Sequence, residues 1–296
     1  MLAWILGSFI PIVPVIGALT AWYFITRDKK NPLEYTSELL RYPAQSLKIR
    51  IWRVTWETVL YTSLIIFTPL AVWLAHFIRV TYFAPVAVPF TTRLLIDLII
   101  AAAVLGPLLF KIVMLIFEHK RLTSSAEAHS AAAQELDQLL SKGARVFHDF
   151  PGAGFYINHI VVASNGVFAI KTEAEPKPND GTAKVLFDGN VMKFPSKVTA
   201  QPILTARQQA RWLADYLFEL SGERVIVHPA VALPGWEIEA KSGMEVFLFN
   251  PKRAYRLPEL YNDNVLSNAQ INKTAELIAQ ISRDSNKDDV TSALFS

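Results

Sequence analysis

Residues 155–175 read FYINHIVVASNGVFAIKTEAE, and this stretch decides the fold of the second half of the chain. Two apolar runs rich in valine and isoleucine flank an Asn-Gly pair at 165–166. An Asn-Gly pair between two such runs is a strong signal for a β-hairpin. Three polar residues, Asn158, Lys171 and Glu173, interrupt the apolar pattern of the two strands. Polar groups at positions where the pattern places core residues indicate a functional site or its remnant.

The hairpin resembles that of the nuclease-related domain (NERD) family, whose members have a fold similar to that of restriction endonucleases. Family members carry Ile-Asp-His on the first strand and Glu-x-Lys on the second. This chain has Ile-Asn-His at 157–159 and Lys-Thr-Glu at 171–173, so asparagine replaces the aspartate and the two charges of Glu-x-Lys are exchanged. The resemblance is clearest from Glu127, which matches a glutamate near the start of the family's first helix, to about Arg256.

The exchanged charges imply a domain without nuclease activity. Nucleases of this type use acidic oxygens to hold Mg²⁺ against the scissile phosphate, and a lysine to steady the attacking water. Residues two apart on a strand point the same way, so the exchange moves the ammonium group of Lys171 towards the metal position. A cation there repels a divalent ion, and Asn158 has no charge to offset it. We expect Lys171 and Glu173 to pair with neighbours across the sheet, and we expect no metal ion or cofactor.

A literal Glu-x-Lys, Glu175-Pro176-Lys177, supports an alternative site. In this alternative, Glu175 and Lys177 act with Asp149 or Glu127 as the partner acid, and the protein is a membrane-tethered nuclease that depends on Mg²⁺. Two prolines place the triplet in a loop beyond the strand, where a rigid metal geometry is harder to hold. The six histidines show no pair at metal-ligand spacing on one element. We therefore favour the inactive domain.

The composition differs between the two halves of the chain. Hydrophobic residues make up 52% of the chain and charged residues 19%, which is too apolar for an ordinary soluble domain. Residues 1–118 hold 10 Lys and Arg against 6 Asp and Glu, whereas residues 119–296 hold 19 against 20. The second half therefore lacks the basic excess of a general nucleic-acid-binding protein. The absence of cysteine excludes disulfides and thiolate metal sites.

Three apolar stretches are predicted to span a membrane, at residues 2–26, 58–78 and 94–117. Each is long enough to cross a bilayer as a helix. The first is followed at once by Arg-Asp-Lys-Lys at 27–30, whereas a secretory signal carries its positive charge before the apolar run. We therefore interpret the first stretch as a retained anchor rather than a cleaved signal.

The distribution of basic residues predicts the orientation. The 27–57 segment carries seven Lys and Arg, and the 79–93 loop carries two. The positive-inside rule therefore places the N-terminus outside and the large C-terminal part in the cytoplasm. We predict a multi-pass protein of a bacterial inner (cytoplasmic) membrane, with a transmembrane region at 1–118 and a cytoplasmic NERD-like domain at 119–296.

Asp97 and Lys111 are ionisable residues within the third apolar stretch. Such residues often mark a transport function. Each lies within a few residues of an end and can reach the interface, as can His76 near the end of the second stretch. An alternative function, in which the spans act on a lipid or a small solute and the domain is regulatory, depends on Asp97 and Lys111.

The hydrophobic periodicity of the second half predicts an α/β fold. The predicted helices cover 126–142, 201–220 and 267–282, with Thr123-Ser124-Ser125 at the start of the first and a frayed tail from Arg283. The predicted strands cover 144–150, 156–163, 167–174, 183–187, 191–194, 225–231 and 245–249. This order agrees with the αβββαβ core that the resemblance implies. The expected fold class is an α-helical membrane region followed by a restriction-endonuclease-like α/β domain.

These observations favour a function other than catalysis. We expect a membrane-anchored, inactive NERD-like protein that acts as a binding or scaffold component of an inner-membrane complex. The expected partners are the lipid bilayer and another protein of that membrane, and the charge balance does not support nucleic acid. A connection with DNA handling or conjugative DNA transfer rests on analogy with the nuclease family.

Overall fold

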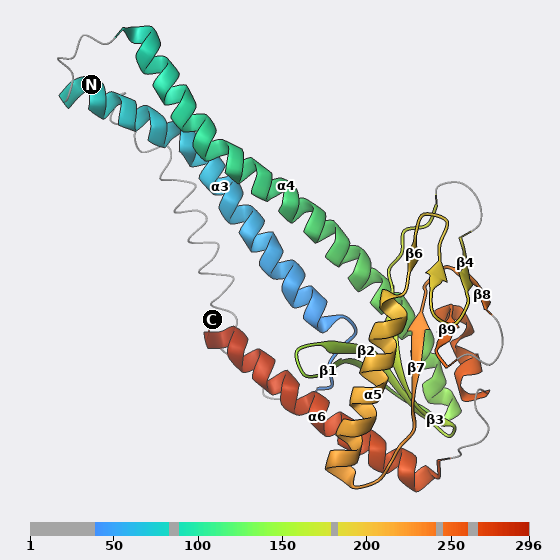
Figure 1. Cartoon of the computed structure of the whole chain (residues 1–296). Coiled ribbons are helices and arrows are strands. Elements are labelled where there is room, and N and C mark those ends of the chain that lie inside the picture. Colours follow the sequence, from blue (N-terminus) through green and yellow to red (C-terminus); the bar gives the residue numbers. More distant parts are fainter. Residues whose placement is uncertain (1–38, 83–88, 179–182, 241–244, 260–265, 296) are drawn as a thin grey trace. The chain divides into compact units, whose positions relative to one another are not determined.

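A computed structural model describes the chain at residues 39–82, 89–178, 183–240, 245–259 and 266–295 (Figure 1). The chain forms two units. The helical unit contains residues 50–122, and the α/β unit contains residues 33–49 and 123–296. The span predicted at 2–26 lies outside the described residues. Residues 39–49, which the prediction assigned to the transmembrane region, lie in the α/β unit.

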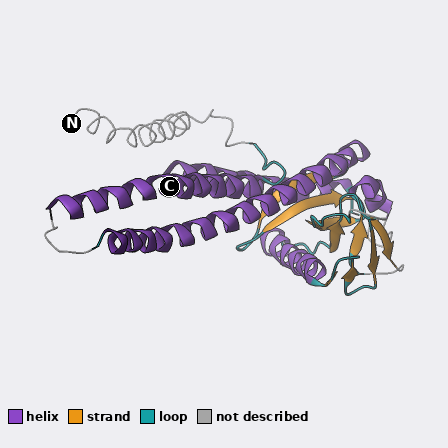
Figure 2. Cartoon of the chain, turned by 90° about the horizontal axis from the view of Figure 1, so that it is seen from above, coloured by secondary structure: helices purple, strands orange, loops and turns teal. Residues whose placement is uncertain are grey.

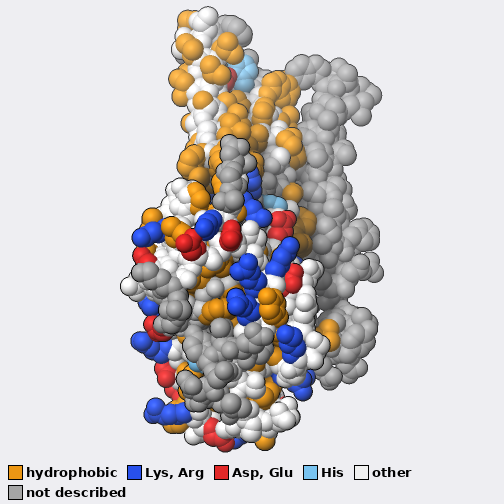
Figure 3. Space-filling view, turned by 90° about the vertical axis from the view of Figure 1, so that its right-hand side faces the viewer, with side chains coloured by type: hydrophobic (Ala, Val, Ile, Leu, Met, Phe, Trp, Pro, Cys, Tyr) orange, Lys and Arg blue, Asp and Glu red, His pale blue; other side chains and the backbone are white. Residues whose placement is uncertain are grey.

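The helical unit is built from two long helices, α3 (Gln45–Tyr82) and α4 (Phe90–Leu136). By length and composition, Gln45–Ile78 and Leu94–Lys142 are apolar enough to cross a membrane. Very little of their apolar surface is buried, unlike the core helix of a soluble protein. Figure 3 shows hydrophobic side chains along this unit and charged side chains over the α/β unit. These helices contain the predicted spans at 58–78 and 94–117 and are weak evidence for membrane association.

Ionisable side chains of the helical unit pair between α3 and α4. Arg50 Nη2 lies 2.6 Å from Glu118 Oε1, and Lys111 Nζ lies 4.0 Å from Glu57 Oε2. His76 Nδ1 contacts Asp97 Oδ2. Asp97 and Lys111 therefore each face a partner of opposite type on the other helix, which lowers the cost of an ionisable group in an apolar helix.

The predicted helix start at 123–125 is wrong, because α4 continues without a break from the apolar stretch to Leu136. No glycine or proline lies between 117 and 126 to stop the helix. A 3₁₀ helix, η3 (Asp137–Lys142), follows α4 and ends at Gly143, whose φ of 85° is the left-handed conformation that glycine adopts without strain. The predicted stop at Gly143 is confirmed.

A five-stranded mixed sheet forms the centre of the α/β unit. Its strands, in sheet order, are β1 (Arg145–Pro151), β2 (Tyr156–Ala163), β3 (Gly166–Thr172), β7 (Val227–Ala232) and β9 (Phe247–Phe249). The first three are antiparallel, and β7 and β9 run parallel to β3. The predicted Asn-Gly hairpin is β2–β3, with Ala163 opposite Gly166. Figure 2 shows all the strands within the α/β unit.

Helices cover both faces of this sheet. The end of α4 and η3 pack on one face, where Leu136 and Leu139 meet Val161 and Ile170. On the other face, α5 (Gln201–Ser221) and α6 (Asn268–Phe295) cover side chains that alternate with these along β2 and β3. Successive side chains of β2 and β3 point to opposite faces of the sheet, and each face has its own apolar core. Both strands therefore consist of continuous runs of apolar residues.

A second, four-stranded sheet packs beside the first. Its order is β6 (Val198–Thr199), β5 (Met192–Lys193), β4 (Lys184–Phe187) and β8 (Glu237–Ala240). Trp236, Phe187 and Met192 form its core with Val231 of β7. The predicted second hairpin is β4–β5, whereas β6 and β8 were missed because they are too short to show a periodicity. A 3₁₀ segment, η4 (Pro251–Glu259), follows β9.

The tail from Arg283 does not fray as expected, because α6 continues to Phe295. Polar residues near the start of this tail make tertiary contacts instead. Ser282 and Asn286 are buried and bind the segment that precedes α3. Single-sequence patterns show no sign of contacts between positions about 240 residues apart.

Candidate functional site

Asn158 lies at the point where the β2–β3 ladder ends. The last backbone pair of this ladder is His159 with Ile170, and the next position on β2 is Asn158. Its side-chain Oδ1 accepts a hydrogen bond of 2.8 Å from the backbone N–H of Thr172. Asn158 is buried, so this bond satisfies an amide that would otherwise lack a partner. In the family motif an aspartate carboxylate oxygen is expected at the position of Asn158 Oδ1. Here this oxygen is already hydrogen-bonded to the backbone of the chain.

Lys171 is the penultimate residue of β3, and Glu173 is the first residue of the loop that follows this strand. Burial lowers the pKa of Lys171, and the charge of Glu173 opposes this shift. Burial also raises the pKa of Glu173, against the effect of Lys171. Among the described residues neither side chain has an ion pair within 4.0 Å, so the expected pairing across the sheet is not found there. Both groups are thus shifted towards their neutral forms.

The residues of the alternative Glu-x-Lys triplet are engaged elsewhere. The carboxylate of Glu175 is buried and lies 2.6 Å from Lys197 Nζ, and its carbonyl accepts a 3.1 Å hydrogen bond from Trp236 Nε1. The end of the Lys177 side chain lies over Gly235, within 2.6 Å of where a Cβ would be. Gly235 has a φ of 77°, so this close approach depends on glycine. The triplet lies in a loop, as predicted.

The two candidate partner acids lie in different surroundings. Glu127 is exposed on α4. Asp149 is 1% exposed on β1, where its Oδ2 accepts from Arg41 Nη2 at 2.9 Å and from the Ser46 N–H at 2.8 Å. Its Oδ1 accepts from the Ser46 hydroxyl at 2.6 Å. Both oxygens of Asp149 are therefore already bound by groups of the chain itself.

Three histidines that no sequence pattern connected lie together beside Lys171. His129 comes from α4, His148 from β1 and His159 from β2, and the rings of His129 and His159 have centroids 6.1 Å apart. His148 Nδ1 lies 2.8 Å from His159 Nδ1. Because the three histidines are on separate elements, their spacing along the sequence does not indicate that they lie close together. The pairing of His148 with His159 would follow from the register of a predicted β1–β2 hairpin.

All three imidazoles are held in the neutral form. Burial, with a smaller effect of Lys171, lowers the pKa of His129 to about 3. Burial is also the main cause of the lowered pKa values of His148 and His159. His148 Nε2 donates to Asp137 Oδ1 at 3.0 Å, so its Nδ1 accepts from the Nδ1–H of His159. This assignment leaves the buried Nε2 of His159 without a proton, and no described residue forms a hydrogen bond with it.

The described residues contain no group of three or more His, Asp or Glu side chains with a geometry that could hold a metal ion.

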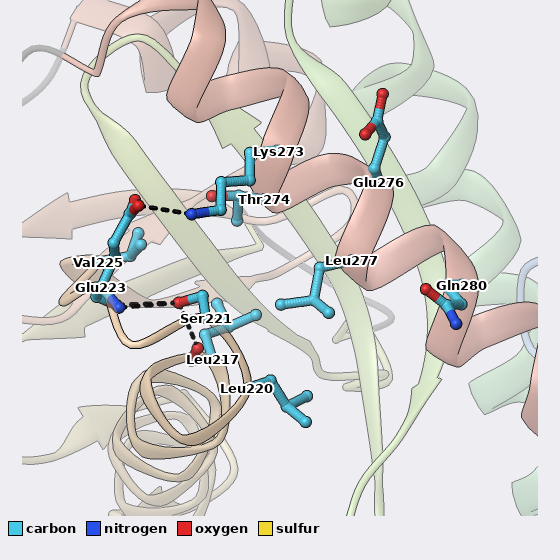
Figure 4. A pocket seen from close by; sticks show the side chains of 10 residues that line it. All are labelled: Leu217, Leu220, Ser221, Glu223, Val225, Lys273, Thr274, Glu276, Leu277 and Gln280. Carbon is cyan, nitrogen blue, oxygen red and sulfur yellow. Dashed lines mark hydrogen bonds and ion pairs between the residues drawn. The ribbon is translucent and has the colours of Figure 1, made fainter.

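Two surface hollows lie away from the predicted site. One, of about 240 Å³, lies between the end of α5 and α6 and has an ion pair of 2.5 Å between Lys273 and Glu223 at its edge (Figure 4). The other lies along α5 beside Arg207, whose Nε is 3.0 Å from Glu245.

The fold and this set of residues define a mixed α/β domain in which Asn158, Lys171 and three histidines lie near the end of the β2–β3 ladder. The family model described as "Nuclease-related domain" (NERD) matches residues 124–234, so this part of the chain is similar to nuclease-related domains. Neither the curated proteins nor the solved structures include a match. The matched part runs from the last turns of α4 to just beyond β7, and it includes neither residues 39–49 nor α6.

Proposed function

We propose that this protein is a membrane-anchored, catalytically inactive nuclease-related protein that acts as a binding or scaffold component of a bacterial inner-membrane complex. The observation that carries the proposal is the state of two positions that match the nuclease motif. Asn158 is bonded to a backbone amide, and a lysine lies at the position of a metal-binding glutamate. Lysine offers no carboxylate oxygen to a divalent ion at this position, and its protonated form repels such an ion.

The alternative function, a metal-dependent nuclease with displaced residues, has less support. It requires Glu175, Lys177 and Asp149 to converge on a metal ion. Glu175 is paired with Lys197, and both oxygens of Asp149 are bound. Each of these bonds would have to break before Mg²⁺ could use the carboxylates, and the chelating geometry would then have to form in a loop.

The membrane location rests on the two long apolar helices and on the basic residues between the first and second apolar stretches. In this proposal the N-terminus is outside, and the nuclease-related domain lies in the cytoplasm, where it binds another protein of the inner membrane. A connection with DNA handling or DNA transfer follows from analogy with nucleases alone. An opposite orientation, found by labelling engineered cysteines at Lys29 and Lys184 from either side of the membrane, would contradict the location.

The first experiment titrates Mg²⁺ and Mn²⁺ into the full-length protein by calorimetry and follows plasmid cleavage on the same sample. We expect no binding heat and no cleavage. The matched variant Asn158→Asp/Lys171→Glu/Glu173→Lys restores the family motif, and we expect it to bind the divalent ion. Binding and cleavage by the unaltered chain, both lost in Glu175→Ala, would overturn the proposal in favour of the alternative nuclease.

The partner is tested by crosslinking in membranes of the cell that makes the protein. We expect one membrane protein to be recovered repeatedly with the full-length chain. The matched control is a chain that ends after Lys120 and so lacks the nuclease-related domain. Recovery of the same protein with both chains would show that the domain is not the binding surface.

A further inference from the structure

Residues 39–46 bind the α/β unit through a buried ion pair, and we call this segment the latch. Arg41 donates from Nη2 and from Nε to Asp149 Oδ2, at 2.9 and 3.3 Å. The side chains are 0% and 1% exposed, which is unusual for two charged groups. The guanidinium carbon of Arg41 lies 4.9 Å from the ring centroid of Tyr156, a cation–π contact. Arg41 is therefore held by the charge of Asp149 and two hydrogen bonds to it on β1, and by the ring of Tyr156 on β2.

Helix α6 forms the other side of the latch site. The Ser282 hydroxyl accepts from the Arg41 N–H at 3.4 Å. Asn286 accepts from Gln45 Nε2 at 2.6 Å and donates to the Leu39 carbonyl at 3.2 Å. The latch thus joins the edge strand β1, the last helix and the first residues of α3 within one unit. All of these contacts involve residues outside 124–234, and they are an addition to the nuclease-related domain.

The backbone is left-handed on both sides of this contact. Ala44 in the latch has a φ of 59°, and Asp149 opposite it has a φ of 51°. These are the only non-glycine residues with positive φ among the described part of the chain. Left-handed backbone is unfavourable for residues with a Cβ, and it persists where surrounding contacts over-determine it. Both residues are almost fully buried, so the closed latch is held against local strain.

We propose that the latch is a reversible conformational device, which opens locally to release Arg41 from Asp149 while the rest of the α/β unit stays folded. Opening exposes Asp149 on the edge strand β1 and Tyr156 on the neighbouring strand β2, which also carries Asn158. It also frees the start of α3, so a movement of this helix and exposure of the sheet edge are linked. The inference does not depend on whether the nuclease-related site is active.

The chain has no cysteine, so single cysteines report opening without interference. We would measure the rate of maleimide labelling of Ser282→Cys in the full-length protein. Two reference variants bracket the scale: Ser141→Cys is exposed on η3, and Ala132→Cys is in the core. We expect Ser282→Cys to react more slowly than Ser141→Cys and faster than Ala132→Cys.

Arg41→Ala tests the ion pair. Removing one partner leaves a buried carboxylate unpaired, so we expect the labelling of Ser282→Cys to accelerate on the order of 100-fold. Arg41→Lys keeps the charge but loses the pair of guanidinium hydrogen bonds and the planar group that packs on Tyr156. We expect its labelling rate at Ser282→Cys to lie between those of the unaltered chain and Arg41→Ala. The Ala132→Cys rate stays unchanged in both backgrounds if the opening is local.

Two results would overturn the proposal. Equal labelling rates of Ser282→Cys and Ala132→Cys in every background would mean that the segment leaves only when the whole unit unfolds. Labelling of Ser282→Cys at the rate of Ser141→Cys in the unaltered background would mean that the latch is not closed at rest.

Discussion

Acid should destabilise the α/β unit through its buried histidines. The pKa of His129 is about 3 in the folded chain against 6.5 for an ordinary histidine. Above pH 6.5 His129 is neutral in both the folded and the unfolded chain, so its titration does not change the free energy of unfolding. Below pH 6.5 the unfolded chain binds a proton that the folded chain does not, and the free energy of unfolding falls by about 1.4 kcal/mol per pH unit for each such group. The loss continues until the pH reaches the folded pKa.

Between pH 7.5 and pH 5.0 this reasoning gives a loss of about 2 kcal/mol from His129 alone. The lowered pKa values of His148 and His159 act in the same direction. The raised pKa of Glu173 acts in the opposite direction, because the folded chain there holds its proton more tightly. A comparison of variants at the same two pH values cancels the contributions that they share.

The assay is urea unfolding of the full-length protein in detergent, followed by tryptophan fluorescence; Trp212 and Trp236 lie in the α/β unit. We expect His129→Gln, which cannot be protonated, to remove about 2 kcal/mol of the difference between pH 7.5 and pH 5.0. His119→Gln, on the same helix but outside the cluster, is the matched control and should leave the difference unchanged. An unchanged difference in His129→Gln would refute the protonation argument.

Three further substitutions test the packing and the backbone. Asp149→Asn leaves Arg41 buried without its counter-charge, so we expect a loss of about 3–5 kcal/mol in the free energy of unfolding, and a loss below about 1 kcal/mol would contradict a buried pair. Leu213→Ala removes a fully buried side chain between α5 and the sheet, and denaturant unfolding should show a loss of about 2–5 kcal/mol. Gly166→Ala places a Cβ 3.0 Å from the ring of His228 at a φ of 127°, so we expect a melting temperature several degrees lower; an unchanged value would show that the turn relaxes.

The sequence of the hairpin was sufficient for its structure, because the information is local. An Asn-Gly pair between alternating apolar residues selects a tight turn, and the turn sets the register of β2 and β3. The polar positions Asn158, Lys171 and Glu173 on this hairpin can also be identified from the sequence without a tertiary structure. Long helices and most strands of the second half also followed from the sequence pattern. The strands β6 and β8 did not, and the two residues of β6 are too few to show a periodicity.

The surroundings of the candidate residues came from tertiary contacts. Asp149 reads as a possible metal ligand in the sequence, yet it is bound by Arg41, which lies 108 positions away in a segment that reads as part of the membrane region. His129, His148 and His159 become neighbours because the sheet places β1 next to β2 and the helix α4 over them. Local patterns fix which backbone conformation a segment adopts. Which segments then meet depends on burying apolar faces against one another, and that packing determines the partners and the pKa values of the polar groups it encloses.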